Sequence, residues 1–407
     1  MTHFADRLID LNNKEYFKIF DGLWRGEKPP LIQVGVIRNT NFTSTGEIDY
    51  SDIAYLNVED NKFRERRLIM GDIIIERSGG GPKQPVGRVV QFNKTEGNYS
   101  FSNFTSMVRI QKPHLLFPQF AFYILLEVYQ SGKTKNIERR TTGIRNLDFS
   151  LYKKLARFPL IPIIEQQKIC NVLSTWDRAI ERVQQLVEAK QRQKNQLVSR
   201  LLSGQKRFPG FQDEWKQVKL GAFLHPKFRK VVKPVGAYLR LGIRSHGKGT
   251  FTSVVDDPET IALTHLFQTR KDDLIVNITF AWEGAIALVG PDGDGALVSH
   301  RFPTYIFDTS KMLPEYFRHL MVTDRFFYEL DLISPGGAGR NRVMNKSDFL
   351  KILVTIPGVE EQKKIAGVLG TMDEQIGLLK KYLERLNEQK KGLMQKLLTG
   401  EIRVKVD

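Results

Sequence analysis

Residues 161–204 read IPIIEQQKICNVLSTWDRAIERVQQLVEAKQRQKNQLVSRLLSG, and residues 356–400 read IPGVEEQKKIAGVLGTMDEQIGLLKKYLERLNEQKKGLMQKLLTG. After one additional residue near Pro357, the two stretches stay in register at an offset of 196 residues. The residues that meet their own kind 196 positions later include Glu165, Gln166, Ile169, Leu173, Asp177, Ile180, Gln193, Lys194, Leu201 and Gly204. The chain therefore contains an internal duplication, and this repeat decides its architecture.

Each stretch predicts one long helix with an apolar seam. The seam positions advance by alternating steps of four and three, which is the 3.5-residue repeat of a coiled coil. A single stripe of this kind would indicate a buried core helix, but two matched stripes predict that the helices pair with each other. Lys194 and Lys390 interrupt both seams at the same depth, where a polar residue lowers stability but helps to fix register. The apolar seam residues are Ile169, Leu173, Trp176, Ile180, Val183, Val187, Leu197 and Leu201 in the first copy, and Ile365, Leu369, Met372, Ile376, Leu379, Leu383, Leu386, Leu393 and Leu397 in the second.

Connectivity predicts that the two helices run antiparallel. Proline stands just before each helix and glycine just after it, as start and stop signals. A helix of about 39 residues is roughly 58 Å long, so one compact domain can join the first helix to the second only if they are antiparallel. We therefore predict two heads at opposite ends of a rigid spacer, related by an approximate two-fold axis. The predicted parts are a first head over 1–160, a spacer helix over 161–204, a second head over 205–355 and a spacer helix over 356–400.

Both heads are predicted to be mixed α/β domains that resemble each other. Strand-like LIQVG (31–35) and GDIII (71–75) in the first head parallel YLRLG (238–242) and DDLIV (272–276) in the second. Helical patterns follow at about 118–130 and 314–330, so the fold class is α/β. A glycine-rich basic loop stands near the end of each head, RRTTGIRN (139–146) and GGAGRNR (336–342).

Charge and composition narrow the classes of partner. The 407 residues carry a formal net charge of +17 and a pI of about 9.7, a balance that favours a polyanion such as nucleic acid or an anionic membrane. No apolar run reaches the roughly 18–20 residues that span a bilayer, which disfavours the membrane. The single cysteine, Cys170, is consistent with a reducing cytoplasm, and its place beside the seam indicates a small buried residue.

The layout of head, IP-x-x-E-Q-x-K-I helix, second head and second helix resembles the specificity subunit of type I restriction–modification systems. The resemblance covers essentially the whole chain, and its most specific parts are the two helix starts (165–169 and 361–365) and the LLSG and LLTG ends. It implies an antiparallel spacer, heads that each read one half of a split DNA target, two modification subunits that carry the methyltransferase activity and, in the full complex, two restriction subunits. The chain itself would then be non-catalytic. Residues 1–30 lack the W-x-x-V-x-L-G start that Trp215–Gly221 gives the second head, so the beginning of the first head stays open.

Six basic clusters are candidates for contact with double-stranded DNA. Lysine and arginine pair with phosphates, whereas arginine, lysine, asparagine and glutamine can read base edges in the major groove. Because the heads differ in sequence, the target is expected to be bipartite and asymmetric. The three clusters of the first head are Arg64, Arg66 and Arg67; Arg77 and Lys83; and Arg139, Arg140, Arg145 and Asn146. The three clusters of the second head are Arg244, His246 and Lys248; His300 and Arg301; and Arg340, Asn341 and Arg342.

Two other functions are weighed against this one. Residues 242–249 nearly fit a phosphate-binding P-loop and would suit an autonomous nucleotide-hydrolysing enzyme, but Gly249 stands where the motif needs Ser or Thr. The second alternative is a coiled-coil adaptor whose charge is incidental. The seven histidines show no metal-ligand spacing, and no Asn/Asp-Pro-Pro-aromatic methylation motif occurs, so we expect no metal and no cofactor.

Overall fold

The fold is described from a computed structural model, which covers residues 8–23, 25–26, 28–43, 45–81, 84–141, 144–337 and 341–405, without the side chains of residues 140 and 141. Contacts divide the chain into two compact units. Unit 1 holds the chain up to Gln185 and again from Lys380, and unit 2 runs from Leu186 to Leu379. Each unit therefore contains one sheet-rich head and parts of both long helices, α4 (Ile163–Leu202) and α8 (Val359–Thr399).

Unit 1 is built from short strands and a few helices, one of which, α2 (Pro118–Gln130), is largely buried. Its strands are β1 (Leu8–Asp10), β2 (Phe17–Asp21), β3 (Leu31–Ile37), β4 (Ala54–Glu59), β5 (Ile73–Glu76), β6 (Ser78–Gly80), β7 (Val89–Gln91), β8 (Tyr99–Phe101), β9 (Thr105–Ile110), β10 (Glu138–Thr141), β11 (Ile144–Leu147) and β12 (Arg157–Pro159). Its other helices are α1 (Asp60–Arg66), α2 (Pro118–Gln130), α3 (Phe149–Leu155) and the 3-10 helices η2 (Asn39–Asn41) and η3 (Lys133–Ile137).

The sheets of unit 1 position a buried helix. Strands pair in the orders β2-β9-β5-β7, β4-β3-β8, β10-β11-β6 and β1-β12. Pro118 opens α2 at its first position, where the missing N–H would be unpaired in any case. The middle of α2, from Phe120 to Leu126, is buried throughout and packs with α4 and α8 in one core. That core includes the expected small buried residue, Cys170.

Unit 2 uses the same kinds of element. Its strands are β13 (Lys216–Lys219), β14 (Leu224–Pro226), β15 (Lys230–Val232), β16 (Tyr238–Ile243), β17 (Thr250–Val255), β18 (His265–Gln268), β19 (Leu274–Val276), β20 (Ile286–Leu288), β21 (Leu297–Val298), β22 (Thr304–Phe307) and β23 (Leu353–Ile356). Its other helices are α5 (Pro314–Leu320), α6 (Asp324–Leu332), α7 (Lys346–Phe349) and the 3-10 helices η4 (Leu220–Ala222), η5 (Pro258–Thr260), η6 (Ala281–Glu283) and η7 (Pro291–Gly293).

The two units share a sheet topology, as the internal likeness of the heads predicts. The sheet β14-β22-β19-β20 has the same order and the same antiparallel pairing as β2-β9-β5-β7. In the second sheet, a hairpin strand pairs in parallel with a later strand in both units, β3 with β8 and β16 with β21. The mixed α/β class and the internal repeat are therefore confirmed.

The first described element of the first head, whose beginning the sequence left open, is strand β1. It pairs antiparallel with β12, just as β13 pairs with β23 in unit 2. Leu11 is buried directly after β1, and Leu220 is buried directly after β13. The LIDL segment of residues 8–11 thus occupies the place of the W-x-x-V-x-L-G start, without the glycine and without the tryptophan whose indole N–H donates to Glu361 at 3.1 Å.

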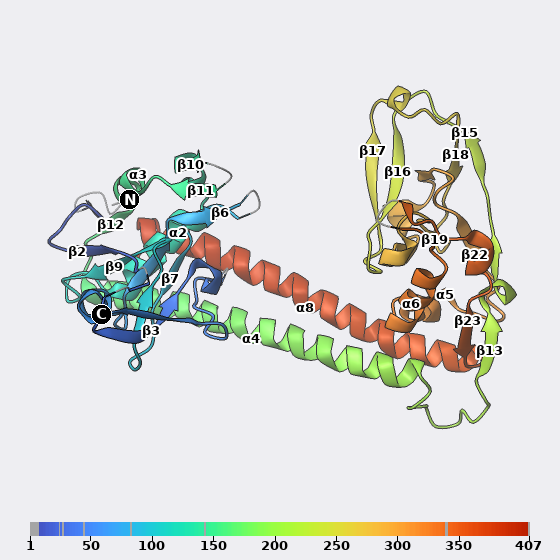
Figure 1. The fold of residues 1–407 in the computed structure, drawn as a ribbon, viewed down its shortest axis with the longest axis horizontal. Coiled ribbons are helices and arrows are strands. Elements are labelled where there is room, and N and C mark those ends of the chain that lie inside the picture. Colours follow the sequence, from blue (N-terminus) through green and yellow to red (C-terminus); the bar gives the residue numbers. More distant parts are fainter. Residues whose placement is uncertain are drawn as a thin grey trace. The chain divides into compact units, whose positions relative to one another are not determined.

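The long helices carry the predicted buried seam (Figure 1, α4 in green and α8 in orange-red). All seam positions on both helices are buried or half-buried, including Lys194 and Lys390. Gly204 and Gly400 follow the two helices with φ of +73° and +76°, a left-handed conformation that ends a helix without steric cost when the residue is glycine. Among the described residues, no helix is long and apolar enough to cross a membrane.

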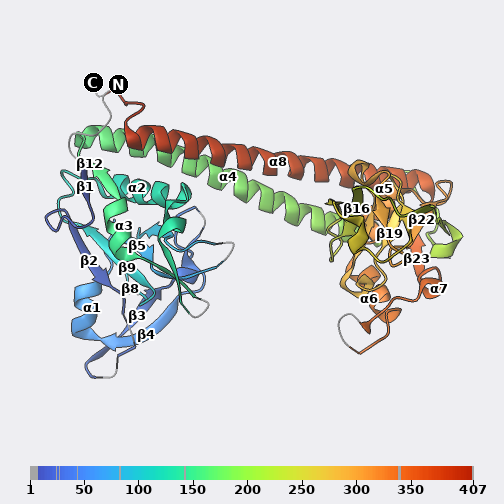
Figure 2. The same cartoon turned by 90° about the horizontal axis from the view of Figure 1, so that it is seen from above.

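Within each unit, the paired parts of α4 and α8 run antiparallel (Figure 2). In unit 1, Glu165 at the start of α4 forms two 2.7 Å hydrogen bonds with Arg403, which follows the end of α8. In unit 2, Glu361 near the start of α8 accepts hydrogen bonds of 3.0 and 2.7 Å from Arg207, which follows the end of α4. Arg207 lies 196 positions before Arg403, so the ion pair itself is duplicated.

The next residue of each helix ties it to its own head. The Gln166 side chain accepts a hydrogen bond from the Phe117 N–H and donates to the carbonyls of Leu115 and Ile161, each at 2.8 Å. Gln362 makes the same three contacts with residues exactly 196 positions later, at 2.9–3.0 Å. Both side chains are buried.

We predict that Gln166→Leu destabilises unit 1 by about 3 kcal/mol, because three partly buried backbone groups lose their partner at about 1 kcal/mol each. Gln362→Leu should cost unit 2 a similar amount. Urea denaturation followed by circular dichroism measures both losses. Gln167→Leu makes the same change at an exposed neighbour and should stay within about 0.5 kcal/mol of wild type; equal losses at 166 and 167 would contradict the role of the buried amide.

A second duplicated cluster differs between the units. In unit 1, the Tyr123 hydroxyl donates to Asp177 at 2.6 Å, and Lys390 pairs with the same carboxylate. In unit 2, Lys194 pairs with Asp373 at 2.5 Å, but the residue at the tyrosine position is His319.

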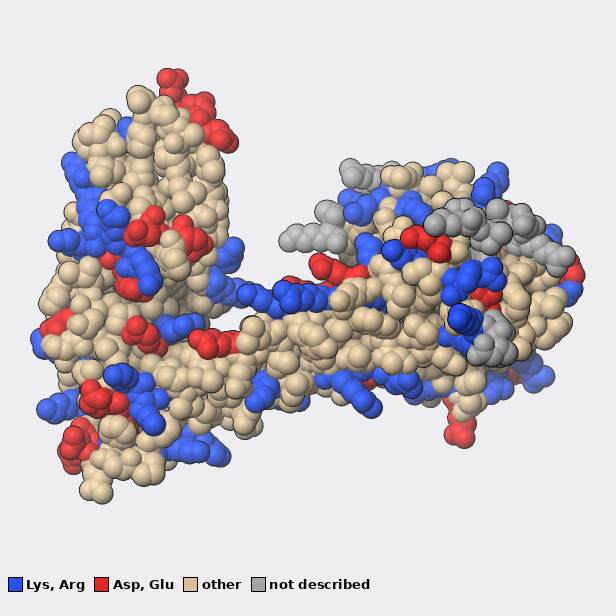
Figure 3. Space-filling model, turned by 180° about the vertical axis from the view of Figure 1, so that it is seen from behind, with Lys and Arg blue, Asp and Glu red and all other residues tan. Residues whose placement is uncertain are grey.

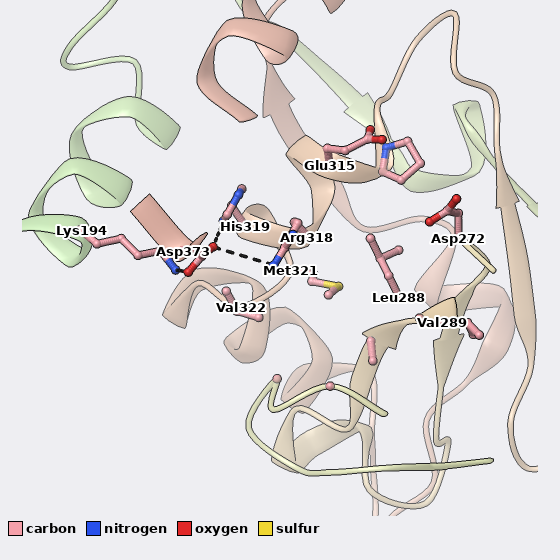
Figure 4. Close-up of a pocket in the computed structure, with 15 residues that line it drawn as sticks. Lys194, Asp272, Leu288, Val289, Glu315, Arg318, His319, Met321, Val322 and Asp373 are labelled. Carbon is pink, nitrogen blue, oxygen red and sulfur yellow. Dashed lines mark hydrogen bonds and ion pairs between the residues drawn. The ribbon is translucent and has the colours of Figure 1, made fainter. Parts of the chain in front are cut away.

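The histidine leaves this junction of unit 2 open. His319 Nδ1 lies 3.9 Å from the carboxylate of Asp373, and Arg318 lies 3.8 Å from it. A pocket of about 500 Å³ opens beside these side chains (Figure 4). Burial and the charge of Arg318 lower the pKa of His319 to about 4.

We predict that unit 2 loses stability as the pH falls from about 6.5 to 4. His319 stays neutral in the folded unit over this range, whereas the unfolded chain protonates it near its ordinary pKa of 6.5. The unfolded state then binds more protons, which costs at most about 3 kcal/mol. His319→Tyr, which can donate to Asp373 as Tyr123 does to Asp177, should remove this dependence in urea titrations monitored by tryptophan fluorescence. The exposed His246→Ala should retain it, and an unchanged pH profile in His319→Tyr would refute the assignment.

Candidate nucleic-acid interface

The loop between β5 and β7, residues 77–87, is the centre of the basic clusters in unit 1, and we call it hub loop 1. Strand β6 within it pairs with β11, so that Gly80 faces Arg145 and Ser78 faces Asn146. The Ser78 hydroxyl also donates to the Asn146 side chain. The glycine-rich segment after Arg77 and the basic loop 139–146, far apart in sequence, therefore meet in one small sheet, β10-β11-β6.

Asp21 connects the remaining cluster of unit 1 to hub loop 1. Arg77 donates to its carboxylate at 2.6 Å, and Arg66 donates to its backbone carbonyl at 3.1 Å. The guanidinium of Arg77 also lies 4.6 Å from the ring centroid of Phe149. Arg66 and Arg77 thus meet on one residue at the end of β2.

The equivalent loop of unit 2, residues 277–285 between β19 and β20, gathers the other three clusters, and we call it hub loop 2. The His246 N–H donates to the carbonyl of Glu283 at 2.7 Å. Arg301 donates to the Thr279 hydroxyl at 3.2 Å. The guanidinium of Arg342 lies 5.0 Å from the ring centroid of Trp282.

Backbone hydrogen bonds show that the two hub loops are equivalent. Leu147 N–H donates to the carbonyl of Arg77, and Met344 N–H donates to the carbonyl of Ile278, both at 2.8 Å. Arg77 therefore corresponds to Ile278, and Asn146 to Val343. The two loops therefore leave equivalent strands at equivalent positions, but hub loop 1 contains strand β6, hub loop 2 contains the 3-10 helix η6, and the side chains that they present differ.

A buried ion pair that the sequence reading missed supports hub loop 1. Glu76 is fully buried and accepts hydrogen bonds of 2.9 and 2.7 Å from Arg88. Arg88 also donates to the Phe42 carbonyl at 3.1 Å, and Asn39 donates to the Ser78 carbonyl at 3.0 Å. The sequence does contain a signal for this ion pair: a charged residue stands next to each of two apolar strands, Glu76 in IIIE and Arg88 in GRVV.

The predicted contact residues differ in how exposed their side chains are and in whether other residues of the chain bind them. Five of them are exposed, and no other residue in the described parts of the chain forms a hydrogen bond or ion pair with their side chains: Arg67, His246, Lys248, His300 and Asn341. Three others are exposed but held: Arg64 pairs with Asp60, Arg139 pairs with Asp148, and Arg244 donates to the Thr250 carbonyl. Arg145 and Arg342 are half-buried and paired with acidic residues. Lys83, Arg340 and the side chain of Arg140 lie outside the described residues.

Charge is distributed over both heads. On the face that Figure 3 shows, Lys and Arg side chains are spread across each head and the helices, with acidic side chains between them. On this face, the distribution offers phosphates many weak contacts instead of one basic stripe.

The segment that resembles a P-loop has the wrong structural context. It joins β16 to β17, two antiparallel strands, with Arg244 N–H donating to the Gly249 carbonyl at 2.9 Å. A P-loop instead leads into a helix, whose N-terminus holds the phosphates. No group of three or more His, Cys, Asp or Glu that could bind a metal occurs among the residues described.

Comparisons with known proteins agree on one family. The family model for the type I restriction modification DNA specificity domain matches residues 214–388. A protein of Methanocaldococcus jannaschii named as the MjaX type I restriction enzyme specificity subunit is 24% identical over 388 residues, covering 89% of this chain and 86% of the relative. The MjaVIII specificity subunit of the same organism is also 24% identical, covering 74% of each chain.

A solved structure shows the same fold. The crystal structure of a type I restriction-modification system S subunit from M. genitalium aligns with 98% of this chain and 99% of its own, with a TM-score of 0.56 at 15% identity. It matches the duplicated heads and long helices described above. Residues 214–388 therefore match the type I restriction modification DNA specificity domain, and most of the chain is similar to two type I restriction enzyme specificity subunits.

Proposed function

We propose that this chain reads a bipartite, asymmetric DNA sequence and directs modification and restriction subunits to it. Each unit reads one half of the target. The chain contributes recognition, and its partners contribute methyl transfer and cleavage. The observation that carries the proposal is the duplicated hub loop: a loop at the same position of the shared sheet, surrounded by basic clusters, occurs once in each unit with different side chains.

The differences between the hub loops support unlike half-sites. An arginine can donate two hydrogen bonds to guanine in the major groove, and an asparagine can pair with adenine. Unit 1 has Arg77 and Asn146 at positions where unit 2 has Ile278 and Val343, which have neither capacity. Unit 2 in turn offers His246, Lys248 and His300 near hub loop 2. Two readers with different chemistry favour two different words.

The exposed cations supply affinity, and the hub loops supply selectivity. Long flexible side chains such as Arg67 and Lys248 can reach phosphates and release counterions without reading sequence. Among the described residues, none forms a hydrogen bond or ion pair with these two side chains, so both are available to phosphates. Groups held at fixed positions, such as Arg77 between Asp21 and Phe149, are better suited to present a defined hydrogen-bond pattern to base edges.

The duplication also favours two copies of each enzyme partner. Both units repeat the Glu–Gln start of a long helix. In each unit the glutamine binds the head, and the glutamate binds an arginine that follows the other long helix. Two equivalent surfaces on one chain suit two identical modification subunits, and restriction subunits would join in the same number. Mass measurement of the co-expressed complex tests this stoichiometry.

The proposal predicts that the chain co-expressed with its modification subunit methylates a split, non-palindromic sequence. Methylome sequencing of the expressing strain should show one such motif. The purified chain alone should transfer no methyl groups. Specific methylation by the chain alone would refute the division of labour, and nucleotide hydrolysis lost on Lys248→Ala would favour the enzyme alternative.

Lys248→Ala should weaken binding of the complex to any duplex several-fold and lower the slope of log K against log salt by about one, because one phosphate contact is lost. Filter binding or fluorescence anisotropy from low to moderate salt measures both quantities. Lys219→Ala, an exposed lysine on β13 outside hub loop 2, is the control and should change neither. Binding that hardly depends on salt in wild type would instead favour the adaptor alternative.

A further inference from the structure

One arginine occupies the same place in both recognition units. Leu147 and Met344 are matched by their hydrogen bonds to hub loops 1 and 2. Two residues earlier, Arg145 and Arg342 stand at the end of the two glycine-rich basic loops. The neighbouring positions differ, Asn146 against Val343, but the arginine is present in both.

In unit 1, Arg145 is tied to the base of its own hairpin. It donates to Glu138 at 2.8 Å, and the other carboxylate oxygen of Glu138 accepts the Val86 N–H at 3.0 Å. The Arg145 side chain is 16% exposed and that of Glu138 is 7% exposed. This pair therefore joins β10 and β11 to the end of hub loop 1.

In unit 2, Arg342 does the same work with different acceptors. It donates to the Ser334 carbonyl at 3.0 Å and pairs with the Asp331 carboxylate at 2.7 Å, both at the end of α6. Its guanidinium also lies beside the ring of Trp282 in hub loop 2. Like Arg145, it is only 22% exposed.

The backbone around Arg342 shows how closely the loop base is held. Val343 N–H donates to the Pro335 carbonyl at 3.3 Å. Gly336 has a φ of +138°, and a side chain there would come within 2.5 Å of the Asn341 carbonyl oxygen. The two ends of the loop therefore meet directly next to the arginine.

Neither arginine is placed as a phosphate contact is. Arg139, on the same hairpin as Arg145, is 73% exposed despite its ion pair. To reach a phosphate, Arg145 would have to leave Glu138, which is almost fully buried and would keep the Val86 N–H, and a poorly paired buried charge is strongly unfavourable. Asp148 is equally buried, but it keeps the N–H groups of Ser150 and Leu151 when Arg139 leaves it. The same residue type at the same position, with an acidic partner from β10 in one unit and from α6 in the other, indicates one shared task.

We propose that Arg145 and Arg342 are positioning residues for DNA reading: each fixes its recognition loop to its hub loop and makes no contact with the duplex. This inference rests on the proposed function. It assigns sequence discrimination in each half-site to a loop whose base is held by an internal ion pair. The sequence alone predicts both residues as DNA contacts, and this proposal replaces that role with an internal one.

The test compares Arg145→Met with Arg139→Met in the complex of the full chain with its modification subunit. Affinities are measured for the cognate duplex and for a non-specific duplex of equal length across a salt series. For Arg145→Met we expect at least a tenfold loss on the cognate duplex, no change on the non-specific duplex and an unchanged salt slope. The loss should fall on the half-site read by unit 1, whereas Arg342→Met should affect only the other half-site. Arg139→Met should lower the salt slope on both duplexes.

Glu138→Gln supplies the second line of the test, because it removes no cation. We expect it to weaken cognate binding as Arg145→Met does, and the double variant should be no worse than either single one. A salt slope reduced by about one in Arg145→Met, or full cognate affinity in Glu138→Gln, would overturn the proposal. If Arg145→Met does not fold, Glu138→Gln alone decides between these results. A wild-type complex without a cognate sequence would instead overturn the proposed function.

Discussion

Two adjacent buried residues at the start of each long helix, Glu-Gln, hold the rest of this structure in place. A buried carboxylate or amide must find partners, because an unpaired polar group inside a protein costs more than most single contacts return. Gln166 satisfies this demand with three backbone groups of its own head, and Glu165 with an arginine that follows the other long helix. Only one register of helix, head and returning chain meets both demands. The apolar seam alone, which a one-heptad slip would largely preserve, is less selective.

The same constraint explains what the two units share and where they differ. The helix starts repeat their arginine and backbone contacts at an offset of 196 residues, whereas the hub loops keep the position at which they leave the sheet and change their side chains. Tyr123 and His319 mark the point at which the shared junction itself begins to differ: the shorter histidine cannot close on its aspartate, and a pocket remains. A fixed frame with variable loops is what a reader of unlike half-sites needs, since rigid elements position a site more accurately than loops do.

Sequence patterns predicted the frame well, because its determinants are local or periodic. The seam, the proline and glycine at the helix ends and the matched strand motifs all lie within short windows. The first strand was missed because LIDL carries neither the tryptophan nor the glycine that marks its counterpart. The basic clusters could be located but not sorted into held and exposed side chains. Arg77 is held by Asp21, which lies 56 residues away, and the backbone carbonyls that Arg342 binds have no sequence signature. Such partners become apparent only when the chain has folded.

The positive side chains of the chain fall into two groups, those paired inside the protein and those exposed to solvent. A guanidinium that pairs with a buried carboxylate contributes little to long-range attraction, because its field is largely cancelled by its partner. Arg88 and Arg145 are of this kind, and they stabilise the bases of loops. Arg67 and Lys248 reach into solvent and can exchange bound counterions for phosphates. The net charge measures only what remains after the internal pairs are subtracted, so affinity for a polyanion and discrimination between sequences depend on different members of the same clusters. A loop whose base is held by such a pair can change the residues at its tip without losing its place beside the hub loop.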